Sequence, residues 1–124
     1  MNLIAAFKDA VEALGCTVHV GRAPDGTPMP YVTLDPPSGR SPEYDTGTAF
    51  GEEQTVRVHV WGTDLDAVER IAHRIEADLM VNGVSASGGT VCDVRREGRD
   101  AFLDPDRDES GDEVWHSVAD YVAT

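Results

Sequence analysis

Residues 54–80 read QTVRVHVWGTDLDAVERIAHRIEADLM, and this stretch predicts a strand that passes directly into a helix. In its first part, valines at every second position alternate with polar and aromatic residues, as in a strand with one face against a core. In its second part, apolar residues recur every three or four positions, which is typical of an amphipathic helix. These residues are Leu65, Val68, Ala72, Ile75 and Leu79. Thr63 or Asp64 can cap the first helical turn.

The segments on either side of this stretch supply the other predicted elements. A first amphipathic helix is expected over residues 2–14, with Gly15 where a helix often ends in a left-handed conformation. Alternating residues at 16–20 and the run 31–34 predict two strands, which we expect to pair as a hairpin. Strands near 90–96 and 114–122 follow the second helix. Between them we expect an acidic loop at about 97–113.

This order of elements predicts one α+β domain over residues 1–124. The order is helix, strand, strand, loop, strand, helix, strand, strand. It indicates a mixed, mostly antiparallel sheet with the two helices packed on one face. A chain of 124 residues of which 40% are hydrophobic is large enough to bury one such core.

A long loop is expected at about 35–53, where proline, glycine and serine replace the periodic pattern. Loops of this length are usually disordered or used for binding. Tyr44 and Phe50 stand in this polar stretch, and they favour a contact arm that orders against a partner. Disorder, or packing of the loop back onto its own domain, is the alternative.

The acidic loop raises the question of a metal site. Its spacing of oxygen-bearing side chains before Gly111 resembles the first half of an EF-hand, but the twelfth position is Ser117 instead of glutamate. We therefore predict no metal site. The loop's aspartates are predicted instead to be interface residues, together with the two aromatics of the arm. They are Asp104, Asp106, Asp108 and Asp112.

No pattern typical of catalysis or cofactor binding stands out. The four histidines, His19, His59, His73 and His116, lack the spacing of a zinc site and are interpreted as ordinary surface positions. The sequence has no Walker loop, dinucleotide fingerprint or nucleophile elbow. We therefore predict no catalytic residues, no cofactor and no enzymatic activity.

The net charge also restricts the partners. With 23 acidic and 10 basic residues, the formal net charge is −13, and tight nucleic-acid binding would require a basic patch instead. The acidic excess can serve solubility, or it can form a surface that repels or imitates DNA. No stretch approaches the roughly 18 apolar residues of a membrane span, so no membrane association is expected.

The strand from Thr55 to Trp61, with Gly62 to Asp64 and the helix that ends at Met80, resembles the tail terminator or tail completion proteins of long-tailed bacteriophages. The later strand Val91 to Arg96, the acidic loop and the closing segment Val114 to Val118 are similar to that family too.

The resemblance implies a structural virion protein without catalytic function, located in the tail or neck and assembled in the bacterial host cytoplasm. It implies that six copies form a ring on the head-proximal end of the tail tube. The ring ends tube polymerisation and offers a docking surface to the head-completion or connector protein. Viral DNA would pass through the lumen, where acidic residues would repel its phosphates.

Two other functions compete with this one. Another head-to-tail joining or tail-tube component would also assemble as a ring on a small fold of this kind. An acidic inhibitor that imitates DNA would need its carboxylates in an ordered stripe, whereas here many are concentrated in the loop.

Overall fold

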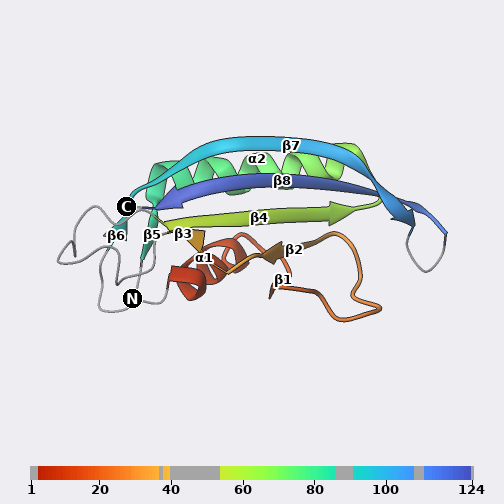
Figure 1. The fold of residues 1–124 in the computed structure, drawn as a ribbon, viewed down its shortest axis with the longest axis horizontal. Coiled ribbons are helices and arrows are strands. Elements are labelled where there is room, and N and C mark those ends of the chain that lie inside the picture. The colour runs from red at the N-terminus through yellow and green to blue at the C-terminus, as the bar shows by residue number, and fades with distance from the viewer. Residues whose placement is uncertain (1–2, 37, 40–53, 86–90, 108–110, 124) are drawn as a thin grey trace.

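A computed structural model of the chain describes residues 3–36, 38–39, 54–85, 91–107 and 111–123. These residues form two helices, α1 (Leu3–Glu12) and α2 (Leu65–Asn82), and eight strands (Figure 1). The strands are β1 (Val18–Val20), β2 (Tyr31–Leu34), β3 (Ser38–Gly39), β4 (Gln54–Gly62), β5 (Val84–Ser85), β6 (Val91–Cys92), β7 (Val94–Arg107) and β8 (Glu113–Ala123). In the described part of the chain, no helix is both long and apolar enough to span a membrane.

The main sheet has the strand order β1-β2-β4-β8-β7, and β3 pairs with β4 beside this path. β5 and β6 form a separate two-stranded sheet. All pairs of the main sheet are antiparallel except β1 and β2, which are parallel. The prediction of an α+β fold with a mixed, mostly antiparallel sheet is confirmed.

The expected hairpin between β1 and β2 is wrong. Val18 lies opposite Val32 and Val20 opposite Leu34, so the two strands run in the same direction. A parallel pair requires the chain to return to the starting end of the first strand, and a short turn cannot do this. The connection at 21–30, which the sequence suggested as a long hairpin tip, is long enough to return in this way.

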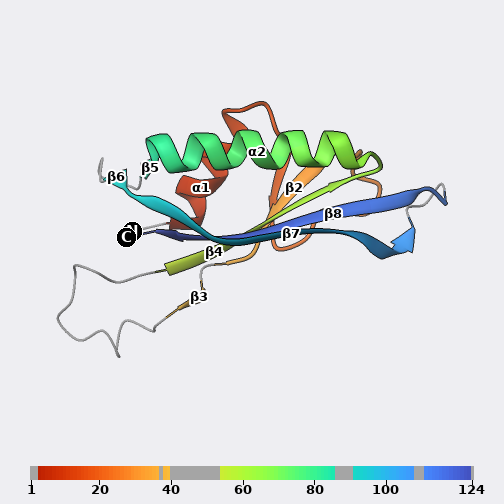
Figure 2. The same cartoon turned by 90° about the horizontal axis from the view of Figure 1, so that it is seen from above.

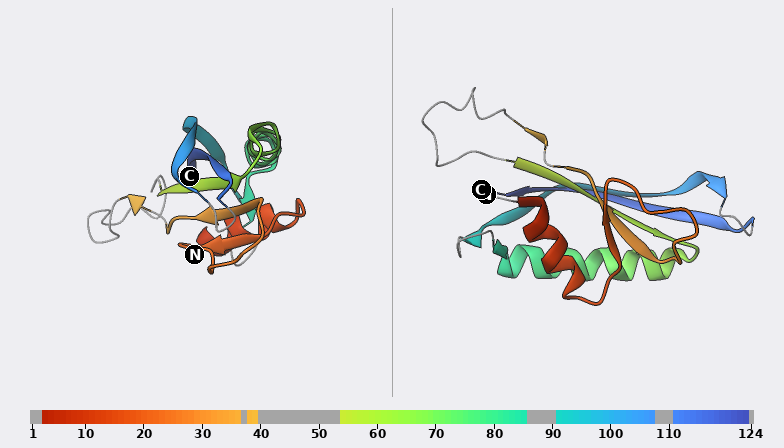
Figure 3. Two further views of the ribbon diagram at one scale, coloured as in Figure 1. Left: turned by 90° about the vertical axis from the view of Figure 1, so that its right-hand side faces the viewer. Right: turned by 90° about the horizontal axis from the view of Figure 1, so that it is seen from below.

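Both helices lie on one side of the main sheet, as predicted (Figure 2 and Figure 3, right). The hydrophobic core fills the space between these two layers. Val56, Val58 and Val60 of β4 point into it and are at most 2% exposed. The helices contribute the fully buried side chains of Phe7, Val11, Val68, Ile75 and Leu79.

The junction between β4 and α2 is tight. The Asp64 side chain accepts a hydrogen bond from the Asp66 backbone N–H at 3.2 Å, which confirms that Asp64 caps α2. Two residues earlier, a Cβ atom on Gly62 would lie 2.7 Å from Val68 Cγ2. Glycine at this position therefore lets the first turn of α2 pack against the end of β4.

The predicted acidic loop at 97–113 is wrong over most of its length. β7 continues to Arg107, and β8 begins at Glu113, the residue opposite Arg107 in the register. Two irregularities in the register, between Arg96 and Gly98 and between Leu103 and Arg107, interrupt the strand's period. Charged residues also occur on both faces of β7, so the alternation by which a strand is recognised is lost.

The predicted long loop at 35–53 is only partly described. β3 occupies Ser38–Gly39 within it, and residues 40–53 lie outside the described residues.

Candidate functional site

The side of the main sheet opposite the helices carries an unusual set of side chains. We call this surface the open face, because neither α1 nor α2 lies over it (Figure 2). The strand registers place on it Tyr31 and Thr33 of β2, Arg57, His59 and Trp61 of β4, His116, Val118 and Asp120 of β8, and Asp100 and Phe102 of β7. Asp35 follows β2 directly and lies at the same surface.

Four ring side chains cross the open face in one row, which we call the ring row: Tyr31, Trp61, His116 and Phe102. Each is directly opposite the next in the register. The ring centroids of Trp61 and His116 are 3.6 Å apart with the planes 14° from parallel, so these two rings stack. Tyr31 lies 6.3 Å from Trp61, and Phe102 meets His116 edge-on at 5.0 Å. His116 is only 7% exposed, although no helix covers it.

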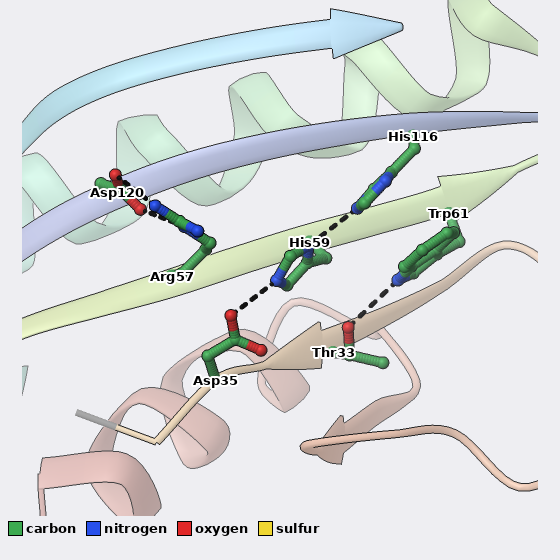
Figure 4. A network of polar contacts seen from close by, with 7 residues as sticks. All are labelled: Thr33, Asp35, Arg57, His59, Trp61, His116 and Asp120. Carbon is green, nitrogen blue, oxygen red and sulfur yellow. Dashed lines mark hydrogen bonds and ion pairs between the residues drawn. The ribbon is translucent and has the colours of Figure 1, made fainter. Parts of the chain in front are cut away.

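A second set of contacts crosses the same strands through polar atoms. We call Asp35, His59, His116 and Asp104 the histidine chain. His59 Nε2 is 2.9 Å from Asp35 Oδ2, and His59 Nδ1 is 2.7 Å from His116 Nε2 (Figure 4). At the other end, His116 Nδ1 is 3.7 Å from Asp104 Oδ2. Four neighbouring strand segments are thereby connected in one line.

The histidine chain is held by its surroundings. Trp61 Nε1 donates a hydrogen bond to Thr33 Oγ1 at 3.1 Å, which fixes the indole over His116 (Figure 4). Burial, and after it the adjacent His59, lower the pKa of His116 to about 4, although Asp104 and Asp35 act in the opposite direction. His116 therefore resists a positive charge of its own at neutral pH.

One exposed ion pair lies next to the histidine chain. Arg57 Nε is 2.8 Å from Asp120 Oδ1, and a second guanidinium nitrogen is 3.3 Å from the other carboxylate oxygen (Figure 4). Asp120 raises the pKa of Arg57 through this hydrogen bond and its charge. The two charges cancel locally, so the excess charge of this surface comes from the other aspartates.

On the helix side of the sheet, β7 carries a different group of charges. Arg96 lies 3.1 Å from Glu76 of α2, and Arg99 lies 3.6 Å from Glu69. The Tyr121 hydroxyl is buried nearby, and burial together with Glu76 raises its pKa well above the ordinary value. These pairs attach α2 to the edge strand, which is a structural role.

The six predicted interface residues lie in different places. Asp104 is at one end of the histidine chain, with a side chain only 15% exposed. Asp112 is exposed in the turn before β8. Asp106 lies within β7, but its side chain is not among those described. The remaining three, Tyr44, Phe50 and Asp108, lie outside the described residues.

Reasoning from the sequence missed His59, His116 and Trp61. The interpretation of His116 as a surface residue is wrong, because neighbouring rings bury it. One signal was available: His59 and Trp61 share the non-valine face of β4, and bulky rings are unusual on a face that only contacts water. The register with β8 was needed to identify their partner.

Among the described residues, no group of three or more histidine, cysteine, aspartate or glutamate side chains is arranged to hold a metal ion. In the histidine chain, the two rings face each other through their nitrogens at hydrogen-bond distance, which leaves no room for an ion between them. The open face is therefore a surface of packed rings and hydrogen bonds.

Comparison with known proteins adds one finding. The model of the family described as "Tail completion protein gp17" matches residues 1–123. This match spans both helices and every strand of the main sheet. A comparison with individually curated proteins finds no match.

Proposed function

Because the chain belongs to the tail completion protein gp17 family, whose members are structural proteins of the phage tail, we propose that it caps the tail tube. Six copies form a ring at the head-proximal end of the tube, and the ring ends tube polymerisation. Its other side provides the docking surface for the head-completion or connector protein. Viral DNA passes through the lumen without specific binding, and the protein catalyses no reaction.

The observation that carries this proposal is the family match over residues 1–123. The fold is compatible with it. A closed ring built from head-to-tail contacts requires two different patches on each subunit. The main sheet presents two unlike sides, one covered by helices and one formed by the open face.

The net charge supports the passage of DNA. At −13 per chain, a ring of this protein repels phosphates unless basic residues are concentrated at the lumen. Of the described arginines, Arg57, Arg96 and Arg99 are already paired with carboxylates. Non-specific retention of DNA is accordingly weak, as a conduit requires.

The test uses purified protein and isolated tail tubes that lack a terminator. Tubes are mixed with the protein, tube subunits are added, and the ends are imaged by electron microscopy. We expect one additional layer at one end of each tube and no further growth at that end. Tubes without the protein, which continue to grow, are the control.

Other outcomes would replace the proposal. Continuous polymerisation of the protein along the tube would identify a tail-tube component. Bare tube ends together with binding to capsids would identify a head-joining component. Bare ends with tight binding to a basic DNA-processing enzyme would identify an inhibitor that imitates DNA.

A further inference from the structure

The histidine chain places two facing imidazoles between two carboxylates, an arrangement that a role in tail assembly does not require. Its members come from the end of β2 and from β4, β8 and β7, so it crosses these four neighbouring strands of the main sheet. Imidazoles face each other at 2.7 Å in its centre, and a carboxylate stands at each end. Each histidine ring therefore has a partner for both of its nitrogens, unlike a histidine that contacts only solvent.

The number of N–H groups is the key quantity. A neutral imidazole has one N–H donor and one acceptor nitrogen, so two neutral histidines together have two N–H groups. The chain has three junctions: Asp35 with His59 at 2.9 Å, His59 with His116 at 2.7 Å, and His116 with Asp104 at 3.7 Å. The last is too long for a hydrogen bond but close enough for strong electrostatic interaction.

When both rings are neutral, the two N–H groups cannot supply a donor to all three junctions, so one junction is electrostatically unfavourable. If His59 donates to Asp35 and His116 donates to His59, the lone pair of His116 Nδ1 faces Asp104. If both rings take the other tautomer, His116 faces Asp104 with an N–H, but the lone pair of His59 Nε2 faces Asp35 at 2.9 Å. In both arrangements a nitrogen lone pair is directed at a carboxylate. If each ring instead donates to its own carboxylate, two nitrogen lone pairs face each other at 2.7 Å.

We propose that the histidine chain binds one additional proton at neutral pH, so that the pair formed by His59 and His116 carries a single positive charge between Asp35 and Asp104. With three N–H groups, every junction has a donor on one side and an acceptor on the other. His59 donates to Asp35 and to His116, and His116 directs its Nδ1–H at Asp104. The four side chains then carry a net charge of −1.

The central contact opposes a second additional proton near neutral pH. At 2.7 Å between the two nitrogens, one of them must keep its lone pair, because two N–H groups would collide there. The pKa of His116, lowered to about 4 by burial and by His59, agrees with this limit. The site therefore takes one proton near neutrality and refuses the next until the medium is strongly acidic.

The other charges around the chain favour the cation. The registers place on the same side of the sheet His19 of β1, Tyr31 of β2, Arg57 of β4, Asp120 of β8, and Arg95 and Asp100 of β7. Arg95 is paired with Glu97 at 3.2 Å. Arg57 and Asp120 neutralise each other. Both helices are on the opposite side of the sheet (Figure 2).

The bound proton also fixes the chain where it leaves β2. The Asp35 backbone N–H donates to the Arg57 carbonyl at 2.9 Å, and its side chain is held by His59. Protonation strengthens the second contact by making it a charge-assisted hydrogen bond. The proton thus stabilises both the open face and the start of the connection that leads to β3.

The test is nitrogen-15 NMR of the histidine rings in the full-length protein, titrated from pH 8 to pH 4. Single His19→Gln and His73→Gln variants assign the signals. At pH 7 we expect three N–H groups on His59 and His116 together, and a fourth only near pH 4. Asp35→Asn and Asp104→Asn should each lower the midpoint of the first protonation by about one pH unit.

The matched control is Asp100→Asn, which removes one negative charge from the same face of β7 at a position opposite Val118. It should move the midpoint by less than about 0.3 pH units, because the remaining interaction is through solvent. Two N–H groups on the wild-type pair at pH 7 would overturn the proposal. So would an Asp104→Asn shift no larger than that of Asp100→Asn. If a variant fails to fold, the wild-type spectrum alone decides.

Discussion

The two faces of the main sheet are built from the same strands but are stabilised in different ways. On the helix side of β4, three valines are covered by α1 and α2 and lose nearly all contact with water. On the open face, the alternate residues are Arg57, His59 and Trp61. Neighbouring side chains partly cover His59 and Trp61, whereas Arg57 is exposed. The helix side is protected by a second layer, and the open face by lateral packing within one layer.

The difference shows that a residue can be buried without a second layer. His116 reaches 7% exposure through stacking with Trp61 and an edge contact with Phe102. Each such ring pair contributes about 0.5–1.5 kcal/mol beyond the area that it buries. A fully buried apolar side chain under the helices contributes about 1.5–3 kcal/mol, so the helix side should dominate the stability of the fold.

The same substitution on the two faces tests this ranking. Phe7 of α1 is fully buried, whereas Phe102 at the end of the ring row is 42% exposed. Phe7→Ala should lower the free energy of unfolding by about 3–5 kcal/mol, because it leaves a cavity between the layers. Phe102→Ala should lower it by about 1 kcal/mol or less. Urea denaturation followed by circular dichroism measures both.

Equal losses for these two variants would contradict the ranking. They would mean that the ring row contributes as much to stability as the helix-covered core. A change in the denaturant slope of either variant would indicate a change in the unfolded or native ensemble instead.

A pair of glycines provides the second test. A Cβ on Gly62 would lie 2.7 Å from Val68 Cγ2, whereas a Cβ on Gly98 of β7 would have no atom within 4 Å. Gly62→Ala should therefore destabilise the protein by about 1–3 kcal/mol, because the first turn of α2 must shift. Gly98→Ala, the matched control, should change stability by less than about 0.5 kcal/mol.

A double variant identifies the cause. If the clash with Val68 is responsible, Gly62→Ala combined with Val68→Ala should cost less than the sum of the two single changes. Thermal unfolding of the four proteins measures this coupling. Strict additivity would show that the loss comes from the backbone of Gly62 and not from the contact.

Much of the helix side could be predicted from the sequence. The valines of β4 and the apolar stripe of α2 follow their periods closely, and Asp64 caps the helix as its position suggested. Such regularity occurs where one face of an element is buried and the other is wet. Two helices packed on one side of a mostly antiparallel sheet follow from these patterns.

The open face could not be predicted in the same way. Its stacking depends on which residues of β2, β4, β8 and β7 lie opposite one another, and the register is a property of the folded sheet. The sequence predicts a loop for β7 beyond Arg96, because Arg99 faces α2 where a core residue is expected and the register irregularities interrupt the alternation. The parallel pairing of β1 with β2 likewise depends on the return of the chain, which local patterns do not show.

The buried His116 should make the open face contribute to the pH dependence of the free energy of unfolding. Its pKa is lowered from the ordinary value near 6.5 to about 4, because the folded protein keeps the ring uncharged. As the pH falls from 6.5 to 4, the unfolded chain binds a proton at this histidine that the folded protein refuses, so the free energy of unfolding decreases. The loss from this group should be about 2 kcal/mol, because its lowered pKa lies at the acidic end of this pH range.

The comparison of wild type with His116→Gln isolates this contribution, because both proteins share the titration of the carboxylates. The variant should be less stable at pH 7 but should lose less stability between pH 6.5 and pH 4. His73→Gln, on the exposed side of α2, is the control for the removal of a histidine outside the open face. Parallel profiles for wild type and His116→Gln would show that His116 is not held uncharged in the folded state.

The smallest loss of stability is expected for the ion pair between Arg57 and Asp120 on the open face. It can be compared with an ion pair on the helix side. The contact is bidentate, but the Arg57 side chain is 52% exposed and that of Asp120 is 32% exposed. Asp120→Asn should therefore cost only about 0.2–1 kcal/mol, and 1 M salt should remove most of the difference from wild type. Glu76→Gln, which disturbs the less exposed pair with Arg96 beneath α2, should cost more and respond less to salt. Urea denaturation at low and high salt separates the two variants. If Asp120→Asn proved the more costly of the two, the charges of the open face would have to be better shielded from solvent than those under the helix.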